Sequence, residues 1–235
     1  MTMMLASVRS LDEALIALEG GADLIDLKEP SRGALGALDH AAVRICVQAI
    51  GGRRPVSATI GDIPSMEPQL MVDAVERMAA TGVDFIKVGF FSHPRAGECA
   101  KTLSDLTGKT RLIAVMFADE SYDVAIVDDL ARSGFAGAML DTAHKTGKTL
   151  RDSRTTSELN EFVTRCRNRS LLTGLAGSLR QADIAPLLAI TPDYLGFRGA
   201  LCQNGVRGQN LDKGAFAAIR LLMPRVIALH QRAAA

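Results

Sequence analysis

The chain has 235 residues and a formal net charge of +1, so no strong field would attract nucleic acid or an anionic membrane surface. It contains no tryptophan and two tyrosines, which argues against an aromatic platform for stacked bases. Hydrophobic residues make up 48% of the chain, enough for a substantial core, yet no unbroken apolar run reaches the ~18 residues of a membrane span. We therefore expect neither a nucleic-acid partner nor a membrane.

Strand-like apolar runs alternate with helical patterns along the whole chain, and glycines follow several of the expected helices. The expected pairs, strand first and helix second, are 3–8 and 11–18, 24–28 and 41–50, 55–60 and 69–80, 85–89 and 97–106, 111–117 and 124–133, 137–140 and 157–168, 171–176 and 181–190, and 194–197 and 213–232.

Eight such units at a period of about 25–30 residues indicate a parallel sheet covered by helices. Their number and the chain length match a single (β/α)8 TIM barrel domain over residues 1–235. A doubly wound open sheet is the alternative architecture. It normally has fewer strands and an asymmetric edge, which the sequence does not indicate.

Three lysines stand where predicted strands end. Lys28 closes the second strand and Lys87 the fourth, while Lys145 follows the sixth. Asp26 precedes Lys28 by two residues and therefore shares its face of the strand, and Asp141 follows the sixth strand. Because the chemistry of a TIM barrel lies at the C-terminal ends of its strands, we expect these five side chains to converge at one mouth.

A lysine amine attacks a carbonyl only when it is unprotonated, and burial or a neighbouring cation lowers its pKa from about 10.4. Three lysines around one mouth supply such neighbours, and the two aspartates could orient amines or move protons. The alternative is that each lysine extends to solvent beside an aspartate. That alternative suits one isolated lysine better than three on alternate strands.

The turns after the seventh and eighth strands are rich in small residues. In barrels these loops often bind phosphate through backbone N–H groups, so Gly177, Ser178, Arg198 and Gly199 predict an anion site, with Arg198 pairing with the anion. Tight connecting turns are the alternative. His144 could be a general acid but fits a solvated loop residue better.

Metal and nucleotide sites are not indicated. No cluster of histidine and acidic residues has metal-ligand spacing, and no G-x-G-x-x-G stretch opens a helix. The four cysteines are scattered without a C-x-x-C motif, which predicts reduced thiols and a cytoplasmic location. We expect no cofactor.

Six stretches together resemble one enzyme family over almost the whole chain. They are Asp26-Leu-Lys28-Glu-Pro30-Ser-Arg-Gly33-Ala-Leu-Gly36-Ala37, Val56-Ser-Ala-Thr-Ile-Gly-Asp-Ile-Pro64, Asp84-Phe-Ile-Lys87-Val-Gly89, Met139-Leu-Asp141-Thr-Ala-His-Lys145-Thr-Gly-Lys148-Thr-Leu150, Leu175-Ala-Gly-Ser178 and Gly196-Phe-Arg198-Gly-Ala-Leu-Cys202. The family is (5-formylfuran-3-yl)methyl phosphate synthase, also called 4-(hydroxymethyl)-2-furancarboxaldehyde-phosphate synthase.

The resemblance implies a phosphate-eliminating carbon–oxygen lyase that condenses two molecules of glyceraldehyde 3-phosphate. The product would be a furan aldehyde phosphate, a precursor of methanofuran or methylofuran in one-carbon metabolism. The resemblance further implies that Lys28 forms a Schiff base, that Lys87 accepts a proton and that Asp26, Asp141 and Lys145 support them. It implies a homo-oligomer and suggests a hexamer.

This chain departs from the family at Thr146, where the family has an aspartate, and over residues 203–210, which look divergent. These departures concern loops and leave the lysine set intact. A class I aldolase or a transaldolase-like enzyme would use the same lysine chemistry, and a non-catalytic phosphate-binding barrel is the alternative outside enzymes. The roles of Asp62, His144 and Lys148 are left open.

Overall fold

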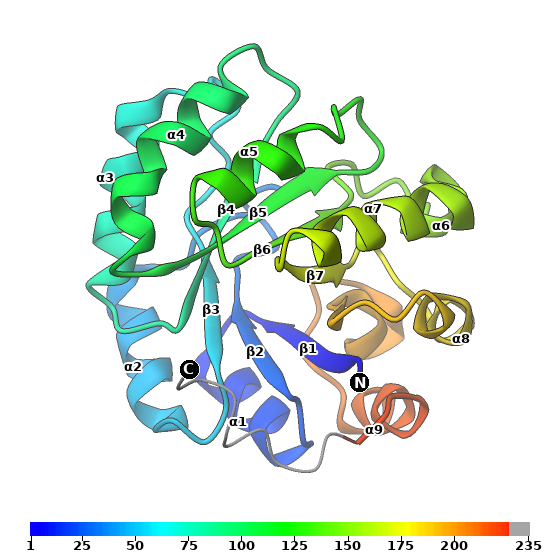
Figure 1. Cartoon of the computed structure of the whole chain (residues 1–235). Coiled ribbons are helices and arrows are strands. Elements are labelled where there is room, and N and C mark those ends of the chain that lie inside the picture. The colour runs from blue at the N-terminus through cyan, green and yellow to red at the C-terminus, as the bar shows by residue number, and fades with distance from the viewer. Residues whose placement is uncertain (226–235) are drawn as a thin grey trace.

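A computed structural model describes residues 1–225, and it shows a closed barrel of eight parallel strands surrounded by helices (Figure 1). The strands are β1 Met3–Val8, β2 Leu24–Leu27, β3 Val56–Thr59, β4 Phe85–Phe90, β5 Arg111–Phe117, β6 Gly137–Asp141, β7 Leu172–Leu175 and β8 Tyr194–Phe197. Each strand pairs with the next in the sequence, and β8 closes on β1 with Ala6 opposite Phe197. The TIM barrel prediction is confirmed, and the open doubly wound sheet is wrong.

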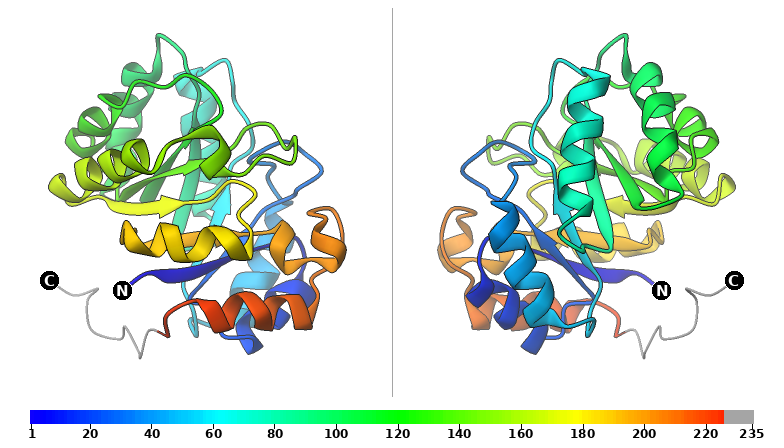
Figure 2. Two further views of the ribbon diagram at one scale, coloured as in Figure 1. Left: turned by 90° about the vertical axis from the view of Figure 1, so that its right-hand side faces the viewer. Right: turned by 90° about the vertical axis from the view of Figure 1, so that its left-hand side faces the viewer.

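The helices lie outside the strands, as the side views show (Figure 2). They are α1 Leu11–Glu19, α2 His40–Ile50, α3 Pro68–Ala79, α4 Ala96–Thr107, α5 Ile126–Arg132, α6 Leu150–Ser153, α7 Thr156–Asn168, α8 Gln181–Ala189 and α9 Lys213–Leu222, with short 3₁₀ turns η1 Gly199–Leu201 and η2 Gln203–Gly205. Among the described residues no helix is long and apolar enough to cross a membrane.

Alternation along each strand divides the apolar residues into two cores. Outward-facing residues such as Ile25 and Ile86 pack against the helices, whereas Val115 and Met139 fill the barrel interior. Tyr194 occupies part of that interior opposite Gly174, where an added Cβ would lie 2.3 Å from the tyrosine ring. Polar side chains replace apolar ones toward the C-terminal ends of the strands, where the interior opens.

Lys87 lies deeper than the sequence analysis predicts. It is the third residue of β4 rather than its last, because β4 continues to pair with β5 as far as Phe90 opposite Met116. Its neighbours Ile86 and Val88 face the helices, so Lys87 points into the barrel. The residue is buried, with 3% of its surface exposed.

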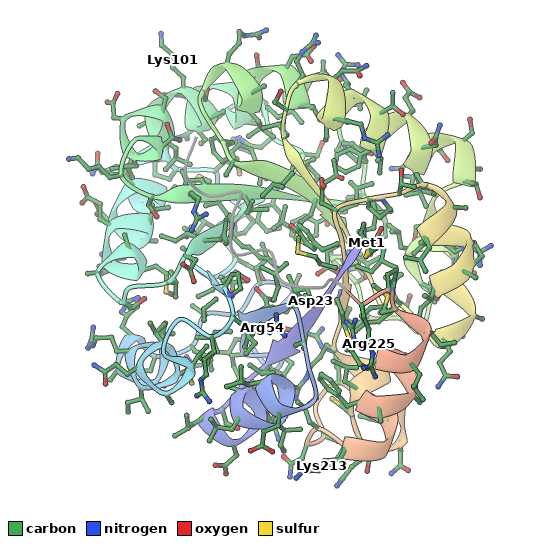
Figure 3. All side chains as sticks on the ribbon, turned by 60° about the horizontal axis from the view of Figure 1, so that its bottom comes forward. Met1, Asp23, Arg54, Lys101, Lys213 and Arg225 are labelled. Carbon is green, nitrogen blue, oxygen red and sulfur yellow. The ribbon has the colours of Figure 1, made fainter. Side chains whose placement is uncertain are left out.

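The last helix is shorter than predicted. The expected helix at 213–232 is α9 Lys213–Leu222, which stops two residues before Pro224, since the residue before a proline disfavours helical backbone. Residues 226–232 of the prediction lie outside the described part. An ion pair of 2.8 Å from Arg220 to the buried Asp23 attaches α9 to the start of β2, at the barrel end where Figure 3 labels Asp23 and Met1.

Three short elements were not predicted from the sequence: α6, η1 and η2. All of them lie in loops that follow strands, where one turn of helix has too few residues to show a period. The cysteines agree with the expectation of reduced thiols, since all four are buried and free.

Candidate active site

Asp141 joins two of the predicted lysines at the mouth of the barrel. Its Oδ1 lies 2.9 Å from Nζ of Lys145, and its Oδ2 lies 3.4 Å from Nζ of Lys28. Lys28 follows β2 directly, and its backbone N–H donates to Val8, so the ladder to β1 fixes the position of its Cα. Lys145 also donates to the hydroxyl of Thr142 at 2.9 Å.

Lys87 forms a second ion pair inside the barrel. Its Nζ lies 2.9 Å from Oδ1 of Asp26, and Ser57 donates to the same oxygen at 2.6 Å. Below it, the centre of the Tyr194 ring is 6.0 Å from the ammonium. Asp26 and Tyr194 are themselves buried. The Lys87 ammonium therefore has one carboxylate partner and an aromatic ring as its neighbours.

Burial sets the direction of the pKa shifts of the two lysines, and the lysine charges set that of Asp141. Burial lowers the pKa of Lys87, Asp26 pulls it upward, and the nearby Lys28 lowers it further. Burial and Lys28 likewise lower the pKa of Lys145 against the opposing charge of Asp141. For Asp141, burial alone would raise the pKa, but Lys145 and Lys28 together hold it well below its usual range. Asp141 therefore stays ionised between the two amines.

The three lysines, Asp26 and Asp141 line one cavity of about 440 Å³, a volume typical of small-molecule sites. All nine predicted site residues line it: Asp26, Lys28, Lys87, Asp141, Lys145, Gly177, Ser178, Arg198 and Gly199. Four further polar side chains line the cavity and were not predicted from the sequence: Ser7, Arg180, Asn204 and Arg207. Asp62, His144 and Lys148 are not among the lining residues.

The residues left without a role in the sequence analysis hold loops or face solvent. Asp62 accepts hydrogen bonds from the backbone N–H groups of Ala34 and Leu35, each 3.0 Å long, and so fixes the loop after β2. The His144 side chain is 68% exposed and lies 3.6 Å from Glu120. A solvated loop position therefore describes His144 better than a general acid.

Within residues 1–225, the turns after β7 and β8 leave backbone N–H groups free at the cavity wall. Gly177 has φ +116° and Ser178 has φ +50°, a left-handed backbone that turns the chain sharply at the cavity wall. In the described chain the N–H groups of Gly177, Ser178 and Gly199 have no protein acceptor. Free N–H groups at a concave wall favour an anion.

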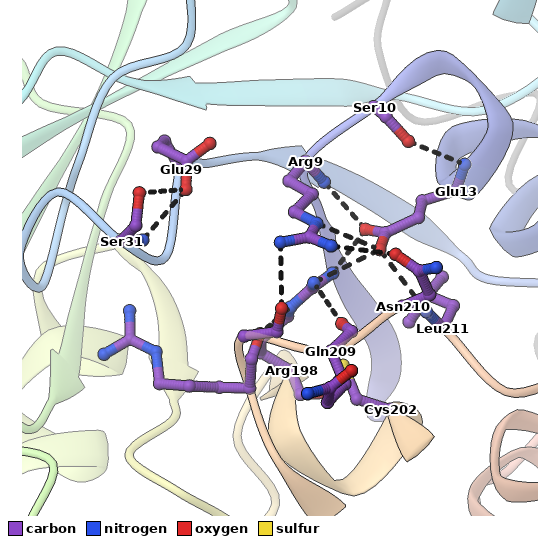
Figure 4. A network of polar contacts seen from close by, with 12 residues as sticks. Arg9, Ser10, Glu13, Glu29, Ser31, Arg198, Cys202, Gln209, Asn210 and Leu211 are labelled. Carbon is purple, nitrogen blue, oxygen red and sulfur yellow. Dashed lines mark hydrogen bonds and ion pairs between the residues drawn. The ribbon is translucent and has the colours of Figure 1, made fainter.

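Arg198 differs from the expectation, because its guanidinium is bound by protein acceptors in the network that Figure 4 shows. It pairs with the buried Glu13 of α1 through Nη1 and Nη2. Its remaining donors reach the carbonyl groups of Ser7, Arg207 and Gln209. A guanidinium with all five N–H groups satisfied has no donor left for a ligand, so the anion would rely on the backbone N–H groups.

Solved structures with low sequence identity confirm the barrel fold. Phosphoribosyl anthranilate isomerase from Thermus thermophilus is 15% identical with a TM-score of 0.66, and the match covers 94% of this chain and 98% of that one. Thiamine phosphate pyrophosphorylase from Pyrococcus furiosus is 12% identical with a TM-score of 0.63, covering 94% of each chain. At these identities the likeness concerns the fold alone.

Proteins with higher sequence identity identify the family as well as the fold. A candidate (5-formylfuran-3-yl)methyl phosphate synthase of Methylorubrum extorquens is 46% identical over 89% of this chain and 86% of its own. The (5-formylfuran-3-yl)methyl phosphate synthase of Methanopyrus kandleri is 37% identical over 88% of this chain and 92% of its own. The family model for 4-HFC-P synthase matches residues 4–220. The protein with this lysine-lined barrel therefore belongs to the 4-HFC-P synthase, or (5-formylfuran-3-yl)methyl phosphate synthase, family.

Proposed function

We propose that the chain condenses two molecules of glyceraldehyde 3-phosphate through a lysine Schiff base. The product is 4-(hydroxymethyl)-2-furancarboxaldehyde phosphate, a precursor of methanofuran or methylofuran. Two C3 units give the C6 furan, and one inorganic phosphate and two waters leave, so the atoms balance without an oxidant or reductant. The observation that carries the proposal is one cavity that holds two separate lysine–aspartate pairs beside free backbone N–H groups.

Lys28 is the proposed nucleophile. It stands where β2 meets the open part of the cavity, and at 8% exposed it is less deeply enclosed than Lys87. A carbonyl that enters from the mouth would reach it first. The imine that forms withdraws electrons from the adjacent carbon, so a proton there becomes acidic enough to be removed.

Lys87 is the proposed proton acceptor. Its burial lowers its pKa, which favours the neutral amine that a base requires. Asp26 holds that amine at 2.9 Å and can stabilise the ammonium after proton transfer. Asp141 and Lys145 complete the set, since Lys145 supplies positive charge for the phosphate that leaves and Asp141 orients Lys145 and Lys28.

Incubation of the pure protein with glyceraldehyde 3-phosphate tests the proposal. We expect a furan absorbance to appear together with one released phosphate per furan. A product that keeps both phosphates would identify an aldolase or a transaldolase-like enzyme instead. Binding of the substrate without any product or borohydride-trapped adduct would identify a non-catalytic phosphate-binding barrel.

Replacing Asp26 with Asn is expected to shift the pH dependence of the reaction. Because the charge of Asp26 raises the pKa of Lys87, its removal lowers that pKa further. Neutral Lys87 then exists at lower pH, so the rising limb of kcat/KM should move toward acid. The measurement is kcat/KM for furan formation as a function of pH. Asp73→Asn is the control, because this carboxylate lies on α3 away from the cavity and is bonded to Gln69. An unmoved limb in D26N would contradict the role of Lys87.

A further inference from the structure

Arg207 lies in the loop between η2 and α9. Hydrogen bonds from arginine side chains of other segments fix the backbone of this loop. The carbonyl oxygen of Arg207 accepts from Nε of Arg198 at 2.9 Å. Arg9 donates to the carbonyl of Gly208 at 2.9 Å and to the side chain of Asn210 at 2.8 Å (Figure 4). The position from which the Arg207 side chain extends is therefore fixed by two other arginines.

The side chain of Arg207 is half-buried and lines the cavity. Its Nη2 donates to the carbonyl of Gly33 at 3.1 Å, so it reaches from the loop after β8 to the loop after β2. A guanidinium has five N–H donors, and within residues 1–225 this is the one hydrogen bond that the Arg207 side chain donates. No carboxylate of the described chain forms an ion pair with it, in contrast to Arg198.

The nearby carboxylates are already engaged. Asp62 accepts from the N–H groups of the loop after β2, and Asp141 binds two lysines. Glu29 accepts from the backbone and the hydroxyl of Ser31. Burial lowers the pKa of Arg207 and the charge of Asp141 raises it, but an arginine remains protonated at any ordinary pH. A partly desolvated cation at a cavity wall is best satisfied by an anion from solution.

We propose that Arg207 binds the phosphate of the second substrate molecule, while the N–H groups of Gly177, Ser178 and Gly199 bind that of the first. The proposal rests on the proposed function, since a condensation of two triose phosphates places two phosphates in one cavity. The planar fork of a guanidinium matches two phosphate oxygens, a fit that a lysine cannot reproduce. Arg198 cannot serve, because Glu13 and backbone carbonyls occupy its donors.

Glycerol 3-phosphate is a suitable probe, because it carries the phosphate but has no carbonyl to react. Calorimetric titration should show two molecules bound per chain in the unmodified protein and one in Arg207→Gln. Arg207→Lys should retain the second molecule with an affinity on the order of tenfold lower, since it keeps the charge and loses the fork. Arg32→Gln is the matched control, an exposed arginine of the loop after β2 that does not line the cavity, and should still bind two.

Binding of two molecules by Arg207→Gln with unchanged affinities would overturn the proposal. So would a single molecule bound by the unmodified protein, or the loss of both molecules in Arg207→Gln, which would assign Arg207 a structural role. The titration requires neither an imine nor a furan. The titration would therefore still test the role of Arg207 in binding if the proposed reaction were not observed.

Discussion

Replacing Lys28 with arginine is expected to abolish the covalent capture of glyceraldehyde 3-phosphate by borohydride. Borohydride reduces the imine between an amine and a carbonyl, and arginine keeps the positive charge but forms no imine at neutral pH. The pairing with Asp141 at 3.4 Å can persist in the variant, so loss of capture would report chemistry rather than a missing charge. Mass spectrometry of the trapped and digested protein is the measurement, and the adduct should map to Lys28.

Lys87→Arg is the matched variant, because it changes the other cavity lysine in the same way. We expect it to retain some trapping, since Lys28 is still present, while furan formation falls by about 10²–10⁴-fold with the loss of the base. An adduct that maps to Lys87 or Lys145 in the unmodified protein would contradict the assignment of Lys28. The Schiff-base mechanism would survive that result, with the roles exchanged.

Replacing Glu13 with alanine is expected to lower the free energy of unfolding by about 3–5 kcal/mol, the cost of removing one partner of a buried ion pair. Glu13 is 4% exposed and accepts from the Arg198 side chain and from the N–H groups of Arg9 and Leu211. Without Glu13, the guanidinium of Arg198 loses its carboxylate partner, and the N–H groups of Arg9 and Leu211 lose their acceptor. Denaturation in urea, followed by circular dichroism, measures the change.

The pair Asp129 and Arg132 on α5 provides the control, because both side chains are well exposed and three residues apart. Asp129→Ala should change the free energy of unfolding by at most about 1 kcal/mol. A double variant, Glu13→Leu with Arg198→Met, should recover part of the loss, since no charge is then left unpaired. Equal effects of Glu13→Ala and Asp129→Ala would show that burial of the Glu13 pair is unimportant.

The fold was largely predictable because each strand and helix carries its own local signal. The eight strand runs end at glycines or polar residues, and the helices have apolar faces at helical spacing. The number of strand–helix units is therefore enough to predict a barrel. The residues at which individual strands and helices end were less predictable. Whether β4 ends at 89 or 90, and whether α9 passes Pro224, depends on the pairing with β5 and on the backbone before a proline rather than on periodicity.

The site was predictable where a residue's position on a strand determines its direction, as for Lys28 and Asp26. It was not predictable where a partner is far away in the sequence. Nothing near Arg198 indicates that Glu13, 185 residues earlier, takes its guanidinium. Arg207 lies in an irregular loop without a period, and its place in the cavity depends on the contacts of Arg198 and Arg9 with the loop backbone.

The pairing of β8 with β1 joins the last strand of the barrel to the first, with Met3 opposite Tyr194. On the ribosome, β1 emerges first and then waits for almost the whole chain to be made, roughly 10–40 s at usual rates of synthesis. Throughout that interval its free N–H and C=O edge is open to pairing with another nascent chain. In the described chain the other strand pairings join neighbours in the sequence, so the closure of β8 on β1 is the contact that we expect to form last. A chaperone that shields strand edges would act in this interval.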